Sequence, residues 1–148
     1  MKTSRHTSKE VCPFCQTFSS KMRHAHVLKT SKDALVYLSQ FEEKRQEHII
    51  ALSLDSAQHL IKRRIITVGL LDTALAHPRE VFCGAIEDRA ASIVIAHNHP
   101  SGEAAPSKQD IETTQQLVAA GILLGIPLRD HIIVTKQAHY SFRQHGLI

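Results

Sequence analysis

The chain has 148 residues, a hydrophobic content of 43% and a formal net charge of +4. This is enough material for one domain with a core of its own, and three cysteines do not suggest a disulfide framework. No apolar run approaches the roughly 20 residues needed to cross a bilayer, and the polar, basic N-terminus lacks the apolar stretch of a secretory signal. We therefore expect a cytoplasmic protein with no membrane partner.

The positive charge is concentrated at the N-terminal end of the chain. Residues 1–45 contain nine Lys or Arg against four Asp or Glu. Residues 1–30 are expected to form a basic extension whose content of Ser, Thr, Lys and His favours disorder, and residues 31–148 are expected to form the folded domain. A basic segment can also contact nucleic acid electrostatically and without sequence preference. Weak nucleic-acid contact is therefore one alternative to a merely solvated extension.

The same extension contains a small group of metal-ligand residue types. Cys12 and Cys15 form a Cys-x-x-Cys pair, and His24 and His26 follow it. Such residues can hold a structural zinc ion. Their spacing departs from that of the usual zinc fingers, so a second metal site and an incidental arrangement both stay open.

The first elements of the domain are predicted to be a helix and two strands. Ser31 is a suitable N-cap for a helix over residues 32–44. The apolar residues of this helix at helical spacing are Ala34, Leu35, Leu38 and Phe41. Strands are expected near 47–54 and 58–67, separated by a turn around Asp55, because apolar and β-branched residues recur in both stretches.

The rest of the chain alternates helices and strands. Pro78 is expected to begin a helix that ends near Asp88, with Cys83 buried in it as a small hydrophobe. The elements expected after it are a strand over 91–97, a helix over 108–124, and strands near 131–136 and 138–142. Hairpins mixed with helical crossovers predict a single α/β domain, with a mixed β-sheet flanked by helices.

The stretch from His97 to Asp110 carries the most specific chemical signal. His97 and His99 end an apolar, β-branched run that predicts a buried strand, so strand alternation points both imidazoles to the same side. Ser107 is placed to cap the next helix, with Asp110 in its first turn and able to face the two histidines. Two His and one carboxylate are a common ligand set for catalytic zinc, which keeps its fourth position for water. We expect His97, His99 and Asp110 to bind Zn²⁺.

Plainer interpretations of some of these residues stay open. Ser107 and Asp110 also form a variant of the capping box, and an acidic residue in the first turn stabilises a helix without any metal. Asp130 and His131 resemble a second catalytic pair. Their place just before Ile-Ile-Val favours a structural role for His131 at the start of a strand.

The spacing resembles a known family signature. His97, His99, Ser107 and Asp110 fill the pattern His-x-His, seven residues, Ser, two residues, Asp, which is similar to the JAMM signature of MPN/JAB metallopeptidase-like domains. The resemblance to the RadC branch covers roughly residues 32–148. Its motifs are His77 to Phe82, Ala96 to Gly102, Leu128 to Val134 and Tyr140 to Leu147. The resemblance implies the MPN/JAB architecture, which is cytidine-deaminase-like.

The resemblance also implies an upstream glutamate that acts as general base, and Glu47 is the matching residue. Glu47 begins a mostly apolar predicted strand, where partial desolvation would raise its pKa and suit it to proton transfer. From the residues alone, a solvated charge at a helix–strand junction is the simpler interpretation of Glu47, because charged residues at the ends of elements are mostly exposed. Glu42 and Glu43 are rivals by composition, although both fall in the predicted helix.

The implied function is a zinc-dependent, RadC-type metallopeptidase that cleaves a peptide or isopeptide bond with a metal-activated water. In that mechanism Glu47 accepts and returns the proton, and the Ser107 hydroxyl donates a hydrogen bond to the developing oxyanion. The alternative is a metal-binding module associated with nucleic acid. The family name carries an association with DNA repair that the fold alone does not justify. A metal-free pseudo-enzyme is the third hypothesis, and the intact set of site residues argues against it.

Overall fold

The structure, a computed structural model, is described for residues 27–69 and 76–148. The candidate metal group of Cys12, Cys15, His24 and His26, with most of the basic extension, lies outside these residues. In the part that is described, no helix is both long and apolar enough to cross a bilayer.

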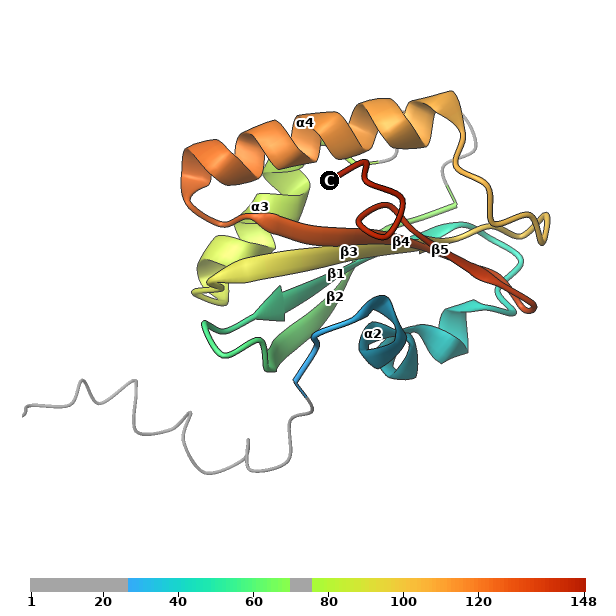
Figure 1. Ribbon diagram of the computed structural model, residues 1–148, viewed down its shortest axis with the longest axis horizontal. Helices are drawn as coiled ribbons and strands as arrows, with labels where there is room; N and C mark the ends of the chain where they lie inside the picture. Colours follow the sequence, from blue (N-terminus) through green and yellow to red (C-terminus); the bar gives the residue numbers. More distant parts are fainter. Residues whose placement is uncertain (1–26, 70–75) are drawn as a thin grey trace, which may run out of the picture.

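A five-stranded mixed sheet forms the centre of the domain (Figure 1). Its strands are β1 (His48–Leu54), β2 (Leu60–Val68), β3 (Ser92–Asn98), β4 (Leu128–Val134) and β5 (His139–Ser141). They lie in the order β2-β1-β3-β4-β5, and every neighbouring pair is antiparallel except the parallel pair β3–β4. The predicted mixed sheet flanked by helices is confirmed.

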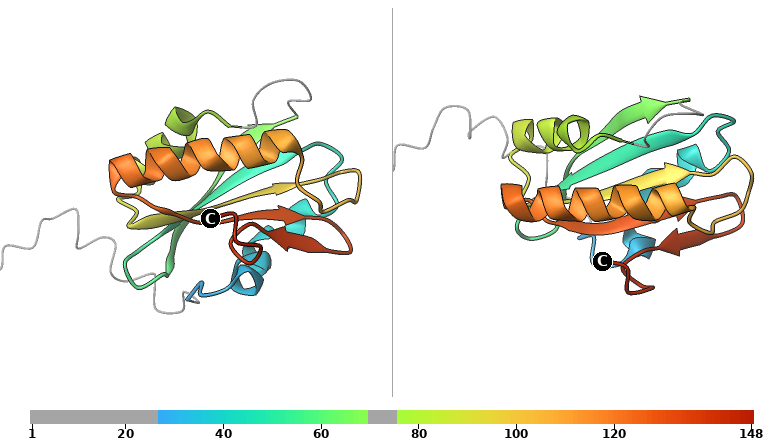
Figure 2. Two further views of the ribbon diagram at one scale, coloured as in Figure 1. Left: turned by 45° about the horizontal axis from the view of Figure 1, so that its top comes forward. Right: turned by 90° about the horizontal axis from the view of Figure 1, so that it is seen from above.

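Helices cover both faces of this sheet (Figures 1 and 2). The helices α3 (Pro78–Glu87) and α4 (Lys108–Leu124) lie on one face, and α2 (Ser31–Leu38) with the short 3₁₀ helix η1 (Ser39–Phe41) lies on the other. The strand β3 is therefore buried along its whole length, because its side chains alternate between two apolar cores. Ile93 and Ile95 face α3 and α4, whereas Val94 and Ala96 face α2.

The crossover β3–α4–β4 places the candidate site at the carboxyl end of β3. Because β3 and β4 are parallel, the chain must cross back over the sheet between them, and α4 forms this crossover. The loop after β3 therefore carries the chain from His97 at the end of the strand to Asp110 in the first turn of α4. The carboxyl ends of parallel strands are where ligand crevices form in α/β sheets.

The first helix is shorter than the sequence predicts and begins one residue earlier. Thr30, not Ser31, is its N-cap: the Asp33 N–H donates to Thr30 Oγ1, and the Thr30 N–H donates to the Asp33 carboxylate at 2.8 Å. This reciprocal capping box fixes the helix start. The α-helix ends at Leu38, and the 3₁₀ turn that follows buries Phe41 against the sheet before the chain enters β1.

Two further expectations are wrong in detail. The strand β4 begins at Leu128, three residues before its predicted start, because Leu128 and Asp130 pair with the parallel strand β3. His131 thus lies within the strand. Cys83, expected to be buried, is exposed. The buried side of α3 is formed by Val81, Phe82, Gly84 and Ala85.

Candidate metal centre

Three polar side chains from the predicted motif converge at the end of β3. The Nε2 atoms of His97 and His99 are 2.9 Å apart, Asp110 Oδ1 is 3.1 Å from His97 Nε2, and Asp110 Oδ2 is 3.6 Å from His99 Nε2. Ligand atoms on a tetrahedral ion with bonds of ~2.05 Å are separated by roughly 3.3 Å. The three side chains therefore already have the spacing that a zinc-sized ion requires.

The capping box of α4 orients the Asp110 carboxylate. Oδ2 accepts hydrogen bonds from the Ser107 N–H at 2.7 Å and from the Ser107 hydroxyl at 2.6 Å, and the Asp110 N–H donates back to Ser107 Oγ at 3.1 Å. Oδ1 is buried, has no hydrogen-bond partner among the described residues, and faces His97. Capping and metal binding were alternatives from the sequence alone. In the structure they use different oxygens of one carboxylate.

His99 presents a free lone pair to the same point. Its Nδ1 lies 2.8 Å from the carbonyl oxygen of Glu103. A carbonyl can only accept, so Nδ1 carries the proton and Nε2 is an acceptor in the neutral ring. In the protonated ring Nε2 would donate to Asp110, and this interaction raises the pKa of His99 despite the opposing effect of its burial. Burial in turn raises the pKa of Asp110, but hydrogen bonds that His97 and His99 donate when their Nε2 atoms are protonated outweigh it and hold that pKa well below the usual range.

A chain of hydrogen bonds behind His97 fixes the direction of its own lone pair. The Thr114 hydroxyl donates its one proton to the Asp110 carbonyl at 2.6 Å, so it accepts from His131 Nδ1 at 2.6 Å. His131 Nε2 then accepts from His97 Nδ1 at 2.8 Å. This assignment, inferred from the network, leaves His97 Nε2 without a proton and pointing at Asp110 Oδ1. Histidines that bind metals are commonly oriented in this way by a partner on the other ring nitrogen.

The sequence context suggests a purely structural role for His131 at the start of a strand. In the structure His131 also contacts a candidate metal ligand. It is fully buried within β4, stacks on Phe142 with ring centroids 4.6 Å apart, and touches His97. Burial holds the pKa of His131 well below its ordinary value, so the ring is neutral. The only sequence signal for this contact is a polar residue within an apolar strand. The pairing of β4 with β3 supplies the rest.

Glu47 lies beside these residues, just before β1. Its Oε1 is 3.9 Å from His97 Nε2, is buried, and has no hydrogen-bond partner among the described residues. Ligand atoms of Glu47, His97 and His99 all lie within 4.8 Å of one another, so this group could hold a metal ion. Of the two rival glutamates, Glu43 is exposed and forms an ion pair with Lys136. Among the described residues, Glu47 is the only one of these three glutamates that is grouped with His97 and His99.

Asn98, between the two histidines, fixes the backbone on both sides of Glu47. Its side-chain amide donates to the carbonyl oxygens of Lys44 at 3.2 Å and Gln46 at 3.0 Å, and its Oδ1 accepts from the His48 N–H at 2.7 Å. Asn98 is 1% exposed. Strand alternation turns its side chain away from the two imidazoles. Sequence reasoning missed this residue, although its place between two candidate ligands was visible.

The site opens to a cavity of about 380 Å³. It is lined by Arg45, Gln46, Glu47, Gly69, His99, Pro100 and Ser101. Glu47 and His99 thus border both the cluster of acceptor atoms and a space of the size in which small ligands and side chains bind. A substrate group in this cavity would lie against the candidate base.

Comparison with known proteins identifies the family. A family model described as the RadC-like JAB domain matches residues 28–147, which is nearly all of the described chain. The chain belongs to the RadC-like JAB domain family. The predicted resemblance is confirmed, and the five-stranded mixed sheet with helices on both faces is consistent with the JAB/MPN fold.

Curated relatives of this RadC-like JAB domain are named only as UPF0758 proteins. The relative from Methanospirillum hungatei is 47% identical over 123 residues, which cover 83% of this chain and 52% of the relative. The relative from Protochlamydia amoebophila is 42% identical over 124 residues, covering 84% and 51%. The chain spans about half the length of the curated relatives it matches. These names state no activity.

Proposed function

We propose that this RadC-like JAB domain is a zinc-dependent hydrolase that cleaves a peptide or isopeptide bond. The observation that carries the proposal is the convergence of three acceptor atoms, His97 Nε2, His99 Nε2 and Asp110 Oδ1, of which the last is buried without a hydrogen-bond partner. Buried acceptors that face one another are unfavourable unless a proton or a cation lies between them. Two imidazole nitrogens and one carboxylate oxygen are a donor set typical of catalytic zinc.

The chemistry follows from what surrounds the donor set. Zinc, when bound, supplies a water of lowered pKa and polarises the scissile carbonyl. Glu47 Oε1 lies 3.9 Å from His97 Nε2 and has no hydrogen-bond partner among the described residues, which supports its assignment as the base that would accept the proton of that water and pass it to the leaving amine. Asn98 holds the backbone of Glu47 in place for this transfer.

Ser107 is assigned the donor to the oxyanion. Its hydroxyl donates to Asp110 Oδ2 in the structure, and a hydroxyl has only one proton. To act on the oxyanion, the hydroxyl must therefore rotate away from Asp110. The Ser107 N–H, at 2.7 Å from Oδ2, continues to hold the carboxylate when it does so. A donor of this kind contributes about 3 kcal/mol to transition-state stabilisation.

Metal analysis and hydrolysis assays test the two halves of the proposal separately. The purified chain is expected to contain one zinc more than His97→Ala and Asp110→Ala do; equal zinc in all three proteins would rule out the metal centre. Glu47→Gln is expected to keep the zinc and lose cleavage of fluorogenic peptides and of a lysine isopeptide. Stoichiometric zinc without any hydrolysis by the parent protein would instead favour a non-proteolytic, metal-binding module.

A further inference from the structure

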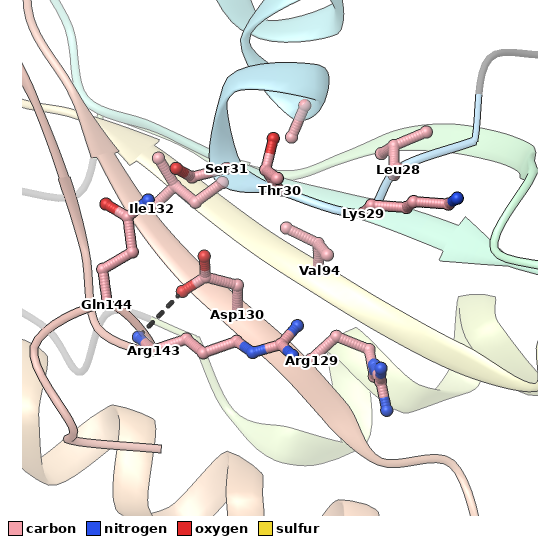
Figure 3. A pocket seen from close by; sticks show the side chains of 11 residues that line it. Leu28, Lys29, Thr30, Ser31, Val94, Arg129, Asp130, Ile132, Arg143 and Gln144 are labelled. Carbon is pink, nitrogen blue, oxygen red and sulfur yellow. Dashed lines mark hydrogen bonds between the residues drawn. The ribbon is translucent and has the colours of Figure 1, made fainter.

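A second cavity, of about 240 Å³, lies on the α2 face of the sheet (Figure 3). It is lined by Leu28, Lys29, Thr30, Ser31, Ala34, Val94, Arg129, Asp130, Ile132, Arg143 and Gln144. Consecutive residues of β4 separate it from the metal centre: His131 faces His97 on one side of the sheet, whereas Asp130 lines this cavity on the other. None of these residues belongs to the candidate metal centre.

The charges around this cavity are unbalanced. Lys29, Arg129 and Arg143 are exposed at its rim, and none of them forms an ion pair with any described residue. The one carboxylate in the lining, Asp130, is 6% exposed and already accepts from the Ser141 hydroxyl at 2.6 Å and from the Arg143 N–H at 3.1 Å. The lining thus contains three cationic residues and a single, engaged carboxylate. An anionic ligand in the cavity would be attracted by this excess of positive charge.

The start of α2 adds hydrogen-bond donors at the same place. In the described chain, the N–H groups of Ser31 and Lys32 have no hydrogen-bond partner, because the capping box satisfies only that of Asp33. Ser31 is 5% exposed, lines the cavity, and its hydroxyl oxygen is buried with no partner. The positive end of a helix dipole and its free N–H groups are suited to bind a phosphate.

We propose that this cavity binds the phosphate group of a small phosphorylated molecule. A phosphate monoester carries the double negative charge that the excess of cations calls for, and arginine binds phosphate oxygens in pairs. The apolar floor, formed by Leu28, Val94 and Ile132, fits the organic part of such a molecule. The volume of about 240 Å³ lies below the usual range of ligand cavities, which restricts the occupant to a small molecule. This binding site does not depend on the hydrolase proposed above, since the sheet separates the two.

Titration with phenyl phosphate, inorganic phosphate and phenol, followed by amide NMR shifts of the full chain at fixed ionic strength, tests the proposal. Phenyl phosphate is expected to shift the Ser31 and Lys32 amides and to bind more tightly than inorganic phosphate, with no shift from phenol. Arg129→Gln combined with Arg143→Gln should weaken binding by about tenfold or more, the loss expected for charge-assisted hydrogen bonds. Both side chains are exposed, so this variant is expected to fold.

A matched variant separates a built site from diffuse charge attraction. Lys62→Gln combined with Arg79→Gln removes the same charge from side chains outside the cavity, and is expected to leave binding within twofold of the parent. Equal weakening in both double variants would overturn the proposal, as would loss of binding in His97→Ala, which would place the phosphate at the metal centre. Tighter binding of single-stranded DNA than of phenyl phosphate at the same amides would overturn the small-molecule assignment.

Discussion

Replacement of His131 by phenylalanine tests whether the buried hydrogen-bond chain prepares His97 for metal. His131→Phe keeps an aromatic ring of similar size against Phe142, on which His131 stacks at an interplanar angle of 14°. It removes the acceptor of the 2.8 Å hydrogen bond from His97 Nδ1. Thr114 keeps its hydrogen bond to the Asp110 carbonyl. The substitution therefore acts mainly on the His97 ring.

The expected loss of zinc affinity is ten- to hundredfold. With zinc on Nε2, the His97 ring must keep its proton on Nδ1, where the variant leaves it buried and unpaired. An unsatisfied buried donor costs ~1–3 kcal/mol, and loss of a partner that orients a metal ligand typically lowers affinity by about 10–100-fold. The metal-free variant is affected less, because His97 can then move its proton to Nε2 and donate it to Asp110 Oδ1 at 3.1 Å.

Competition with a chelating dye gives the zinc dissociation constant, and urea unfolding with and without zinc gives the stability of both forms. Ile132→Val is the matched control, because the side chain of Ile132, next to His131 in β4, packs on the opposite face of the sheet. This change should cost about 0.5–1.5 kcal/mol of stability and leave the zinc affinity unaltered. A zinc affinity for His131→Phe within twofold of the parent would refute the reasoning. So would an equal loss of stability with and without zinc, which is the behaviour of a purely structural residue.

Three further substitutions test other contacts. Asn98→Ala should keep zinc but slow peptide hydrolysis about ten- to hundredfold, because Glu47 is no longer held; an unchanged rate with zinc bound contradicts this. Burial raises the pKa of Asp88, but hydrogen bonds from Arg64 outweigh it and lower that pKa. The charged pair therefore stabilises the fold above pH ~3.9 and is lost as the pH falls through the lowered value. Asp88→Asn should cost about 2–3 kcal/mol in urea unfolding at pH 7 and clearly less at pH 3, and an equal cost at both would argue against the pair. Gly121→Ala should destabilise by about 1–3 kcal/mol, although alanine favours helices, because its Cβ would lie 2.7 Å from a backbone carbonyl oxygen after α4; a stabilised variant would show that the helix can shift.

The sequence by itself predicted the class of fold and the composition of the motif. The mixed sheet with flanking helices follows from apolar stretches and their turns, and these signals are local. The grouping of His97, His99 and Asp110 could also be expected, because one strand, one loop and one helix start contain all three. Boundaries were less certain: Thr30 caps the first helix only because the side chain of Asp33 completes its capping box.

Only the tertiary structure decided which distant residues act on that motif. His131 reaches His97, and Asn98 holds the chain around Glu47, because the strand order places β1 and β4 on either side of β3. The cavity below α2 likewise joins three separate segments, around Lys29, Arg129 and Arg143. The spacing of residues along the chain predicts contacts between residues that are close in sequence. Contacts between strands depend on their order and register, which form only when the two apolar cores close on the sheet.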